Sequence, residues 1–372
     1  MRLSISVLAL VCVQSTAGAD PDPLASWRSA LARACDGRGQ ARIALFGDSH
    51  VASDGLGGAL RDILQRRCGD AGPGFVIPVA PTTFYAHRRV ALDARGPWRR
   101  LRVDPRRPAP GAYGLGGAAV EPVDRRSAAR IVTGAIDALE VWALARPGGG
   151  TLEVRIDRQP VRSIVTSAAA EAPLFAGVPI APGPHSIVLG ARGDGPVRIF
   201  GLALDRTGPG VIVDALGLDG ARASSLVLWR EDLLRAHLRR RAHDLVVLAY
   251  GTNEVASGRP PARELESDLT EVVARLRRLQ PDASCLLVGP TDLPSASPRR
   301  SRTVIEIQSR VARAAGCAYF DSTAAQGGPG ATARWAAATP PLVGPDLVHM
   351  TDEGYAFLAR ELARAIGVSL TP

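Results

Sequence analysis

Short apolar runs that alternate with helical patterns are the feature that most constrains the fold of this chain. Such runs predict buried strands, and apolar residues at helical spacing between them predict covering helices. The predicted strands are Ala41–Phe46, Gly210–Ala215, Asp244–Ala249, Leu286–Val288 and Ala318–Phe320. The predicted helices are Leu56–Arg67, Arg263–Leu279, Thr303–Ala315 and Asp352–Ile366. Strands that alternate with helices favour a doubly wound parallel sheet of the α/β class.

The middle of the chain has a different pattern. It is rich in Pro and Gly, and turn signals separate short predicted strands at Ala138–Leu144, Thr151–Ile156, Ser186–Gly190 and Val197–Leu204. Short strands joined by turns favour a small antiparallel sandwich. Because this region falls between the first helix and the second strand of the α/β pattern, we interpret residues 79–206 as an inserted domain. Residues 20–78 and 207–372 are then the two halves of the α/β domain.

The amino-terminal residues indicate export. Arg2 precedes the apolar run Leu3–Val13, and small residues end at Ala19, which predicts a signal peptide over residues 1–19. The apolar run is too short to span a bilayer. A lipoprotein signal built on Cys12 is the alternative, although the residues before Cys12 are not small. We expect an exported bacterial protein, periplasmic or secreted, whose mature form has no transmembrane segment.

Four cysteines remain after the signal peptide is removed, and an even number in an exported protein suggests disulfides. Cys285 and Cys317 each open an apolar run, so neighbouring parallel strands would place their sulfur atoms side by side. We predict the pair Cys285–Cys317 and, by exclusion, the pair Cys35–Cys68. Four buried thiols are the alternative, and the sequence alone leaves the pairing open.

Composition and missing motifs exclude several classes of function. The formal net charge is +9, and all 45 basic residues are arginine, so a P-loop lysine and a pyridoxal-phosphate Schiff base are excluded. Aromatic residues make up only 5%, few for a base-stacking surface, and we expect no nucleic-acid partner. The chain has neither a G-x-S-x-G elbow nor an H-E-x-x-H zinc motif. Residues 114–119 match G-x-G-x-x-A, but no predicted strand precedes them.

Ser49 is the candidate nucleophile. It follows the predicted strand Ala41–Phe46, at the carboxyl end where α/β sheets place their ligands. A serine hydroxyl holds its proton too tightly at neutral pH and needs a base. Asp346 and His349 supply one, because their spacing lets the carboxylate reach Nδ1 of the imidazole and leaves Nε2 for Ser49. Each piece alone could be an ordinary loop or turn, and together they predict a Ser-His-Asp triad.

The oxyanion that serine attack creates needs preorganised donors. Asn253 follows the strand Asp244–Ala249, and Gly220 follows the strand Gly210–Ala215. Because parallel strands end at one edge of a sheet, these residues should meet Ser49 there. The candidate oxyanion hole is therefore the Asn253 amide with the backbone N–H groups of Gly220 and Ser49. Each feature could also be a plain strand-to-loop turn.

These pieces resemble the four sequence blocks of the SGNH (GDSL) hydrolase family. The blocks are Gly47-Asp48-Ser49, Gly220, Gly251-Thr252-Asn253-Glu254, and Asp346 with His349. Glu254 departs from the family's usual Gly-x-Asn-Asp. The chain is more narrowly similar to the peptidoglycan O-acetylesterase branch, which carries a jelly-roll insert like a carbohydrate-binding module. The similar stretches are Gly47–His50, Gly69–Phe75, Asp214–Ala221, Ala249–Glu254 and Gly327–Gly330.

The resemblance implies a three-layer α/β/α flavodoxin-like fold with a parallel sheet, plus an inserted all-β jelly-roll-like domain. It implies an exported serine esterase that removes O-acetyl groups from a polysaccharide, such as peptidoglycan, through an acyl-enzyme on Ser49. Asp346 would orient His349, and neither a metal nor an organic cofactor would be needed. Two other functions stay open. One is a polysaccharide O-acetyltransferase that uses the same triad, and the other is a non-catalytic polysaccharide-binding protein.

Several side chains near these motifs have two interpretations. His50 could touch the substrate or pack the loop that carries Ser49. Tyr85, Trp98 and Tyr113 could stack on sugar rings or fill the core. The other histidines are interpreted as structural or solvent-facing, namely His87, His185, His237 and His243.

Overall fold

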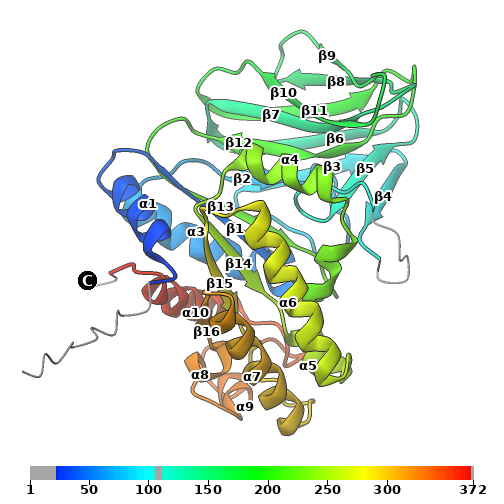
Figure 1. The fold of residues 1–372 in the computed structure, drawn as a ribbon. Coiled ribbons are helices and arrows are strands. Elements are labelled where there is room, and N and C mark those ends of the chain that lie inside the picture. Colours follow the sequence, from blue (N-terminus) through cyan, green and yellow to red (C-terminus); the bar gives the residue numbers. More distant parts are fainter. Residues whose placement is uncertain (1–21, 105–110, 370–372) are drawn as a thin grey trace, which may run out of the picture.

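A five-stranded parallel sheet forms the centre of the α/β part of the molecule (Figure 1). The computed structural model describes residues 22–104 and 111–369, so the predicted signal peptide and Cys12 lie outside the described residues. The strands are β1 (Gln40–Gly47), β13 (Gly210–Gly217), β14 (Leu245–Ala249), β15 (Ser284–Val288) and β16 (Ala318–Phe320). All neighbours are parallel, in the order β13-β1-β14-β15-β16. The predicted parallel sheet is confirmed, and counted along the chain its order is the flavodoxin-like 2-1-3-4-5.

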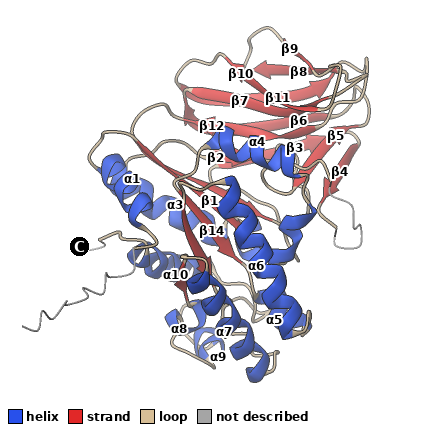
Figure 2. Ribbon diagram, viewed as in Figure 1, coloured by secondary structure: helices blue, strands red, loops and turns tan. Residues whose placement is uncertain are grey.

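Helices cover both faces of this sheet (Figure 2). Alternate residues of β1 point to opposite faces, so Ile43 and Leu45 join one hydrophobic cluster while Ala44 and Phe46 join another. The first cluster includes α1 (Ala25–Cys35), α3 (Gly55–Cys68) and α10 (Asp352–Ala365). The second includes α4 (Glu231–Arg241), α6 (Ala262–Leu279) and α7 (Pro298–Ala314). The α7 helix begins at Pro298 rather than at the predicted Thr303, because its first turn carries arginines outside the apolar pattern.

The chain between α3 and β13 forms two antiparallel sheets. The first has the order β10-β7-β12-β5-β4, with β2 also paired to β12, and the second has the order β3-β6-β11-β8-β9. The strands of the first sheet are β2 (Gly74–Val76), β4 (Trp98–Arg102), β5 (Ala118–Pro122), β7 (Ala138–Ala145), β10 (Ala172–Val178) and β12 (Ile199–Asp205). Those of the second are β3 (Val90–Arg95), β6 (Ala128–Ile136), β8 (Thr151–Ile156), β9 (Arg162–Val165) and β11 (Gly183–Ala191). Apolar residues of both sheets belong to one buried cluster, so the sheets pack face to face.

Short helices follow several strands and complete the described chain. They are α2 (Ser49–Ala52), the 3-10 helix η1 (Ala223–Leu228), α5 (Thr252–Ser257), α8 (Ser322–Ala325) and α9 (Ala331–Ala336). No helix within residues 22–104 and 111–369 has the length and apolarity to cross a membrane. The first three of these elements follow β1, β13 and β14, so they lie where the sheet order places a ligand crevice.

Both predicted disulfides are present. The bond Cys35–Cys68 joins the ends of α1 and α3, and the bond Cys285–Cys317 joins β15 to the residue before β16. Leu286 is paired in register with Ala318, so the cysteines that precede these residues lie next to each other, as the parallel-strand argument predicts. The alternative of four free thiols does not describe this structure.

Candidate active site

Ser49 lies directly after β1, at the start of the one-turn helix α2. The Asp48 carboxylate caps this helix, because its Oδ1 accepts a hydrogen bond from the His50 N–H at 3.1 Å. Gly47 has no room for a side chain, since a Cβ there would lie 2.8 Å from the carbonyl oxygen of Ala249. This tight turn holds the Ser49 side chain at the carboxyl end of the sheet.

The structure brings Ser49, His349 and Asp346 into one hydrogen-bonded chain. Nε2 of His349 lies 2.7 Å from Oγ of Ser49, and Nδ1 of His349 lies 2.6 Å from Oδ2 of Asp346. The carboxylate accepts the Nδ1 proton, which leaves Nε2 unprotonated and able to accept the serine proton. Ser49 and His349 are 300 positions apart in the sequence. They meet because the loop before α10, which carries His349, lies at the carboxyl end of β1, where Ser49 follows the strand.

The loop that carries Asp346 is shaped around its carboxylate. Oδ1 of Asp346 accepts hydrogen bonds from the backbone N–H groups of Val348 and His349, both at 3.0 Å. Partial burial acts to raise the pKa of Asp346, but these bonds and the contact with His349 outweigh it and hold the pKa below its usual range. Leu347, which lies between Asp346 and Val348, adopts a left-handed φ of 56°. Backbone strain of this kind persists where surrounding contacts fix the geometry.

The two expected side-loop donors lie next to each other. Nδ2 of Asn253 donates to the carbonyl oxygen of Ala221 at 2.9 Å, so the Asn253 amide contacts the residue after Gly220. Gly220 has a φ of 71°, and a Cβ there would meet no atom within 4 Å, so its peptide borders open space. The loops that carry both residues start beside Gly47, which is paired in register with Gly217 and Ala249.

Glu254 contacts the loop that carries Gly220. Its Oε1 accepts a hydrogen bond from the N–H of Ala223 at 3.1 Å, and its Oε2 is buried with no hydrogen-bond partner among the described residues. Burial raises the pKa of Glu254 to about 7. The residue that departs from the family pattern therefore contacts the segment that follows Gly220.

Asp48 and His50, which flank Ser49 in the sequence, are both buried. Burial raises the pKa of Asp48 to about 7 and lowers the pKa of His50 to about 3. Nδ1 of His50 lies 2.9 Å from the hydroxyl of Tyr355, and the His50 ring packs 5.3 Å from the ring of His349. His50 is 8% exposed, which favours the packing interpretation over contact with substrate.

An open cleft of about 410 Å³ lies on the His349 side of the site. Phe84 lines it, and its ring lies 4.9 Å from the ring of His349 while the residue is 44% exposed. The sequence analysis missed this residue because a single Phe in an irregular loop carries no periodic signal. Its position suggests contact with substrate.

The three aromatic residues that the sequence singled out lie in different environments. The hydroxyl of Tyr85 accepts a hydrogen bond from the Ile77 N–H at 2.8 Å, and Nε1 of Trp98 donates to the Arg95 carbonyl at 3.0 Å. Both rings pack on the hydrophobic core, so they fill space rather than face a sugar. Tyr113 lines a second cleft that also includes Gly220.

Two comparisons with known proteins show what this chain is similar to. Residues 174–357 match the model of the GDSL-like lipase/acylhydrolase family. A solved structure of a peptidoglycan O-acetylesterase is 25% identical in sequence and has a TM-score of 0.77. The alignment covers 92% of this chain and 95% of the esterase chain. The chain is an SGNH (GDSL) hydrolase. It is thus an enzyme of the ester-hydrolase class, and the matched stretch contains Gly220, Asn253, Asp346 and His349, whereas Ser49 precedes it.

Other solved structures resemble this hydrolase less closely. A family two carbohydrate esterase from Cellvibrio japonicus is 14% identical, covers 74% of this chain and 98% of its own, and has a TM-score of 0.32. An acetyl xylan esterase is 20% identical, covers 42% of this chain and 80% of its own, and has a TM-score of 0.33. A search of the curated proteins finds no match.

No group of three or more His, Cys, Asp or Glu side chains in the described ranges is arranged to hold a metal ion. The other histidines contact structural partners. Nε2 of His243 lies 2.8 Å from Asp214, and Nδ1 of His185 lies 2.8 Å from Asp157. His87 and His237 are buried.

Proposed function

We propose that this hydrolase is an exported serine esterase that removes O-acetyl groups from a polysaccharide, most specifically peptidoglycan. The observation that carries the proposal is the hydrogen-bonded chain from Asp346 through His349 to Oγ of Ser49. A nucleophile, a base and an orienting carboxylate in this order are what acyl transfer through a covalent intermediate requires.

The first step is attack by Oγ of Ser49 on the acetyl carbonyl carbon. Nε2 of His349 takes the serine proton, and the Asp346 carboxylate stabilises the resulting imidazolium. The tetrahedral intermediate then collapses, the bond to the sugar oxygen breaks, and His349 gives its proton to that oxygen. The acetyl group is left as an ester on Ser49.

The second step is hydrolysis of the acyl-enzyme. Water gives a proton to His349 and attacks the acetyl carbonyl, and acetate leaves as Ser49 regains its proton. The N–H groups of Ser49 and Gly220 and the Asn253 amide bind the oxyanion in both steps. One such donor is typically worth about 2.7–4 kcal/mol.

The substrate class rests on the likeness to the peptidoglycan O-acetylesterase and on the exposed aromatic ring beside the catalytic base. Phe84 is 44% exposed and its ring centroid lies 4.9 Å from that of the His349 ring, and we expect it to pack against a sugar ring next to the ester. We also propose that residues 79–206 form a jelly-roll-like insert resembling a carbohydrate-binding module. Residues 20–78 and 207–372 then form the hydrolase domain, and residues 1–19 are the export signal.

The test is acetate release by the mature protein from O-acetylated peptidoglycan, with acetylxylan and an aryl acetate as further substrates. Ser49→Ala should reduce the rate on all of them to background, because no other described hydroxyl contacts His349 Nε2. Ser267→Ala, at an exposed position of α6, is the matched control and should keep full activity.

Full activity in Ser49→Ala would show that another residue is the nucleophile. Acetyl transfer to a muropeptide without free acetate would assign the chain to the acetyltransferases instead. Polymer binding with no Ser49-dependent turnover of any ester would leave the non-catalytic binding protein as the function.

A further inference from the structure

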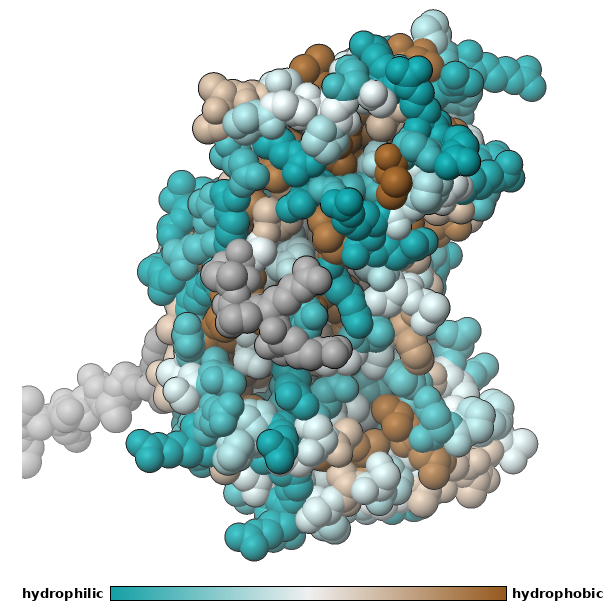
Figure 3. Space-filling view, turned by 90° about the vertical axis from the view of Figure 1, so that its right-hand side faces the viewer, coloured by the Kyte–Doolittle hydropathy of each residue, from teal (hydrophilic) through white to brown (hydrophobic). Residues whose placement is uncertain are grey.

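A second cleft lies on the Gly220 side of the site and has a volume of about 750 Å³. One wall is strand β4 from the antiparallel part, and the other is the loop that contains Gly220. The face of the molecule that includes β4 is largely hydrophilic, with hydrophobic residues in small groups (Figure 3). The cleft shares Gly220 with the candidate oxyanion hole, so it borders one of the groups expected to contact the reacting ester.

Arginine side chains dominate the polar lining of this cleft. They are Arg99, Arg100, Arg102 and Arg222, and the acids that line it are Asp104 and Asp219. Two of the arginines have carboxylate partners, because Arg99 pairs with Glu121 at 3.1 Å and Arg102 lies 3.7 Å from Asp219. The cleft therefore keeps an excess of positive charge.

Arg100 and Arg222 hydrogen-bond to neutral acceptors and form no ion pair with a described carboxylate, although the charge of Arg222 also acts to lower the pKa of the buried Glu254. Nε of Arg100 donates to the carbonyl oxygen of Ala80 at 2.9 Å, and Nη2 of Arg222 donates to the hydroxyl of Ser257 at 2.8 Å. A guanidinium carries five N–H donors, so each of these contacts leaves several donors for another group. Their planar arrangement matches a carboxylate in particular.

We propose that this cleft is a subsite for a carboxylate carried by the same polysaccharide whose acetyl ester reacts at Ser49. Arg100 and Arg222 bind the carboxylate, and the ring of Tyr113 in the same cleft packs against the neighbouring sugar or peptide group. The inference rests on the proposed function and narrows it. The enzyme should prefer an acidic glycan, such as peptidoglycan with its peptide carboxylates, to a neutral acetylated glycan.

A nucleic acid is the other polyanion that arginines could bind. The cleft contains one aromatic ring and two acids, whereas single-stranded nucleic acid is held by several stacking rings along a continuous basic groove. Continuity with Gly220 favours a group on the ester substrate itself.

The test compares one polymer in two charge states. O-acetylated peptidoglycan is used as isolated and after its peptide carboxyl groups are converted to amides, and kcat/KM for acetate release is measured on both and on an aryl acetate. The variants are Arg100→Ala, Arg222→Ala and the double variant. Arg158→Ala is the matched control, because Arg158 is exposed in the turn between β8 and β9.

In the double variant, kcat/KM on the native polymer should fall at least tenfold more than on the amidated polymer or the aryl acetate. The wild type and Arg158→Ala should show the same preference for the native polymer, and added salt should weaken it. Equal losses on native and amidated polymer would overturn the subsite. So would a loss of oligonucleotide binding in the variants without a change in polymer turnover.

The subsite and the proposed function fail in different ways. If the wild type shows Ser49-dependent hydrolysis of the aryl acetate but releases no acetate from peptidoglycan, the proposed substrate is wrong. If it does release acetate from peptidoglycan and the arginine variants keep the wild-type ratio, only the subsite is wrong.

Discussion

Two carboxyl groups, those of Asp48 and Glu254, are buried beside the candidate site, and neither forms an ion pair with a described arginine. Burial raises the pKa of each to about 7, and each has one carboxyl oxygen without a hydrogen-bond partner among the described residues. A buried carboxylate is costly, so the protonated form is favoured below that pH. Stability should therefore depend on pH in a range where most proteins are insensitive.

Glu254→Gln tests this dependence. Burial raises the pKa of Glu254 from its ordinary value of 4.5, which applies to the unfolded chain, to about 7 in the native state. Its contribution to stability is thus fully present below about pH 4.5 and is lost as the pH rises through about 7. The amide side chain of the variant keeps an oxygen acceptor for the Ala223 N–H but cannot ionise. We expect the Tm of the variant at pH 8 to exceed that of the wild type, by roughly 2–4 °C for each kcal/mol gained.

The measurement is thermal unfolding of the wild type and the variant between pH 5 and 8.5. Glu264→Gln is the control, because Glu264 is exposed on α6 and should leave the pH profile unchanged. A profile for Glu254→Gln that is parallel to the wild-type profile would contradict the prediction.

Phe84→Ala tests contact between substrate and the ring beside His349. The residue is 44% exposed, so its removal should cost little stability, while an aromatic packing contact is worth about 0.5–1.5 kcal/mol. We expect KM for the polymer to rise roughly two- to tenfold, with Tm nearly unchanged. Val165→Ala, 63% exposed on the distant strand β9, is the control. A lower Tm with an unchanged KM would instead indicate a packing role.

At the residue scale, the sequence predicted the polar members of the candidate site and missed Phe84. Ser49, Asn253 and Gly220 each follow an apolar run, and the topology of a parallel sheet places such positions at one edge. The pairing of His349 with Ser49 was inferred only from the need of a serine nucleophile for a base, because no sequence spacing relates residues so far apart. The contacts of Glu254 and Phe84 depend on loop conformation, which sequence periodicity does not encode.

At the scale of elements, burial decided which strands the sequence could predict. Four of the parallel strands, β1, β13, β14 and β15, are almost entirely buried and contain apolar runs, and the sequence predicted all four. The edge strand β16 is only half-buried, and it was predicted because its three residues are apolar or aromatic. In the antiparallel part, β3 and β4 were missed because most of their residues are exposed and three of the five in β4 are arginine. The strands β2, β5, β6, β9 and β10 were also missed.

The disulfide Cys285–Cys317 gives a prediction at this scale. It holds β16, a three-residue strand at the sheet edge that pairs only with β15, and it closes a sequence separation of 32 residues. For a loop of this length the cross-link is worth about 3–4 kcal/mol. We expect the double variant Cys285→Ala/Cys317→Ala to lose several degrees in Tm.

Reductant provides the control for this experiment. It should lower the Tm of the wild type more than that of the double variant, which has one disulfide fewer to lose. A double variant with the wild-type Tm in oxidising buffer would show that the bond adds no stability.

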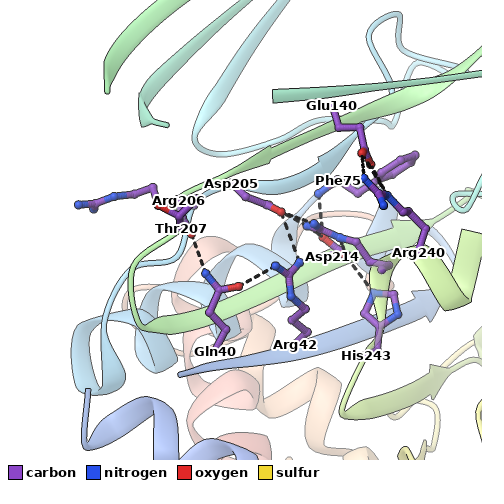
Figure 4. A network of polar contacts seen from close by, with 12 residues as sticks. Gln40, Arg42, Phe75, Glu140, Asp205, Arg206, Thr207, Asp214, Arg240 and His243 are labelled. Atoms are coloured by element: carbon purple, nitrogen blue, oxygen red, sulfur yellow. Dashed lines mark hydrogen bonds and ion pairs between the residues drawn. The ribbon is translucent and has the colours of Figure 1, made fainter. Parts of the chain in front are cut away.

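At the scale of the whole molecule, a buried charge network joins the parallel sheet to the antiparallel part (Figure 4). Asp214 on β13 accepts hydrogen bonds from Nε of Arg241 at 2.6 Å, from Nε2 of His243 at 2.8 Å and from the Phe75 N–H on β2 at 2.7 Å. Arg241 also pairs with Asp205 on β12. One hydrophobic cluster extends through both parts as well. The sequence predicted an insertion but not this network, because its members come from four separate segments of the chain.

Shared core and shared charges imply that the two parts unfold together. We expect the wild type to show a single calorimetric transition.

Asp214→Ala tests the contribution of the charge network. The substitution should lower the free energy of unfolding of the protein by about 3–5 kcal/mol, because the Arg241 charge loses a partner and the Phe75 N–H is left buried without an acceptor. Asp93→Ala removes the exposed pair with Arg95 and should change stability by less than about 1 kcal/mol. Asp214 is paired in register with Ala44, well before the strand ends that carry Ser49, so folded Asp214→Ala should keep its esterase rate at low temperature. Two separate transitions in the wild type would mean that the insert is an independent folding unit and that the junction only tethers it.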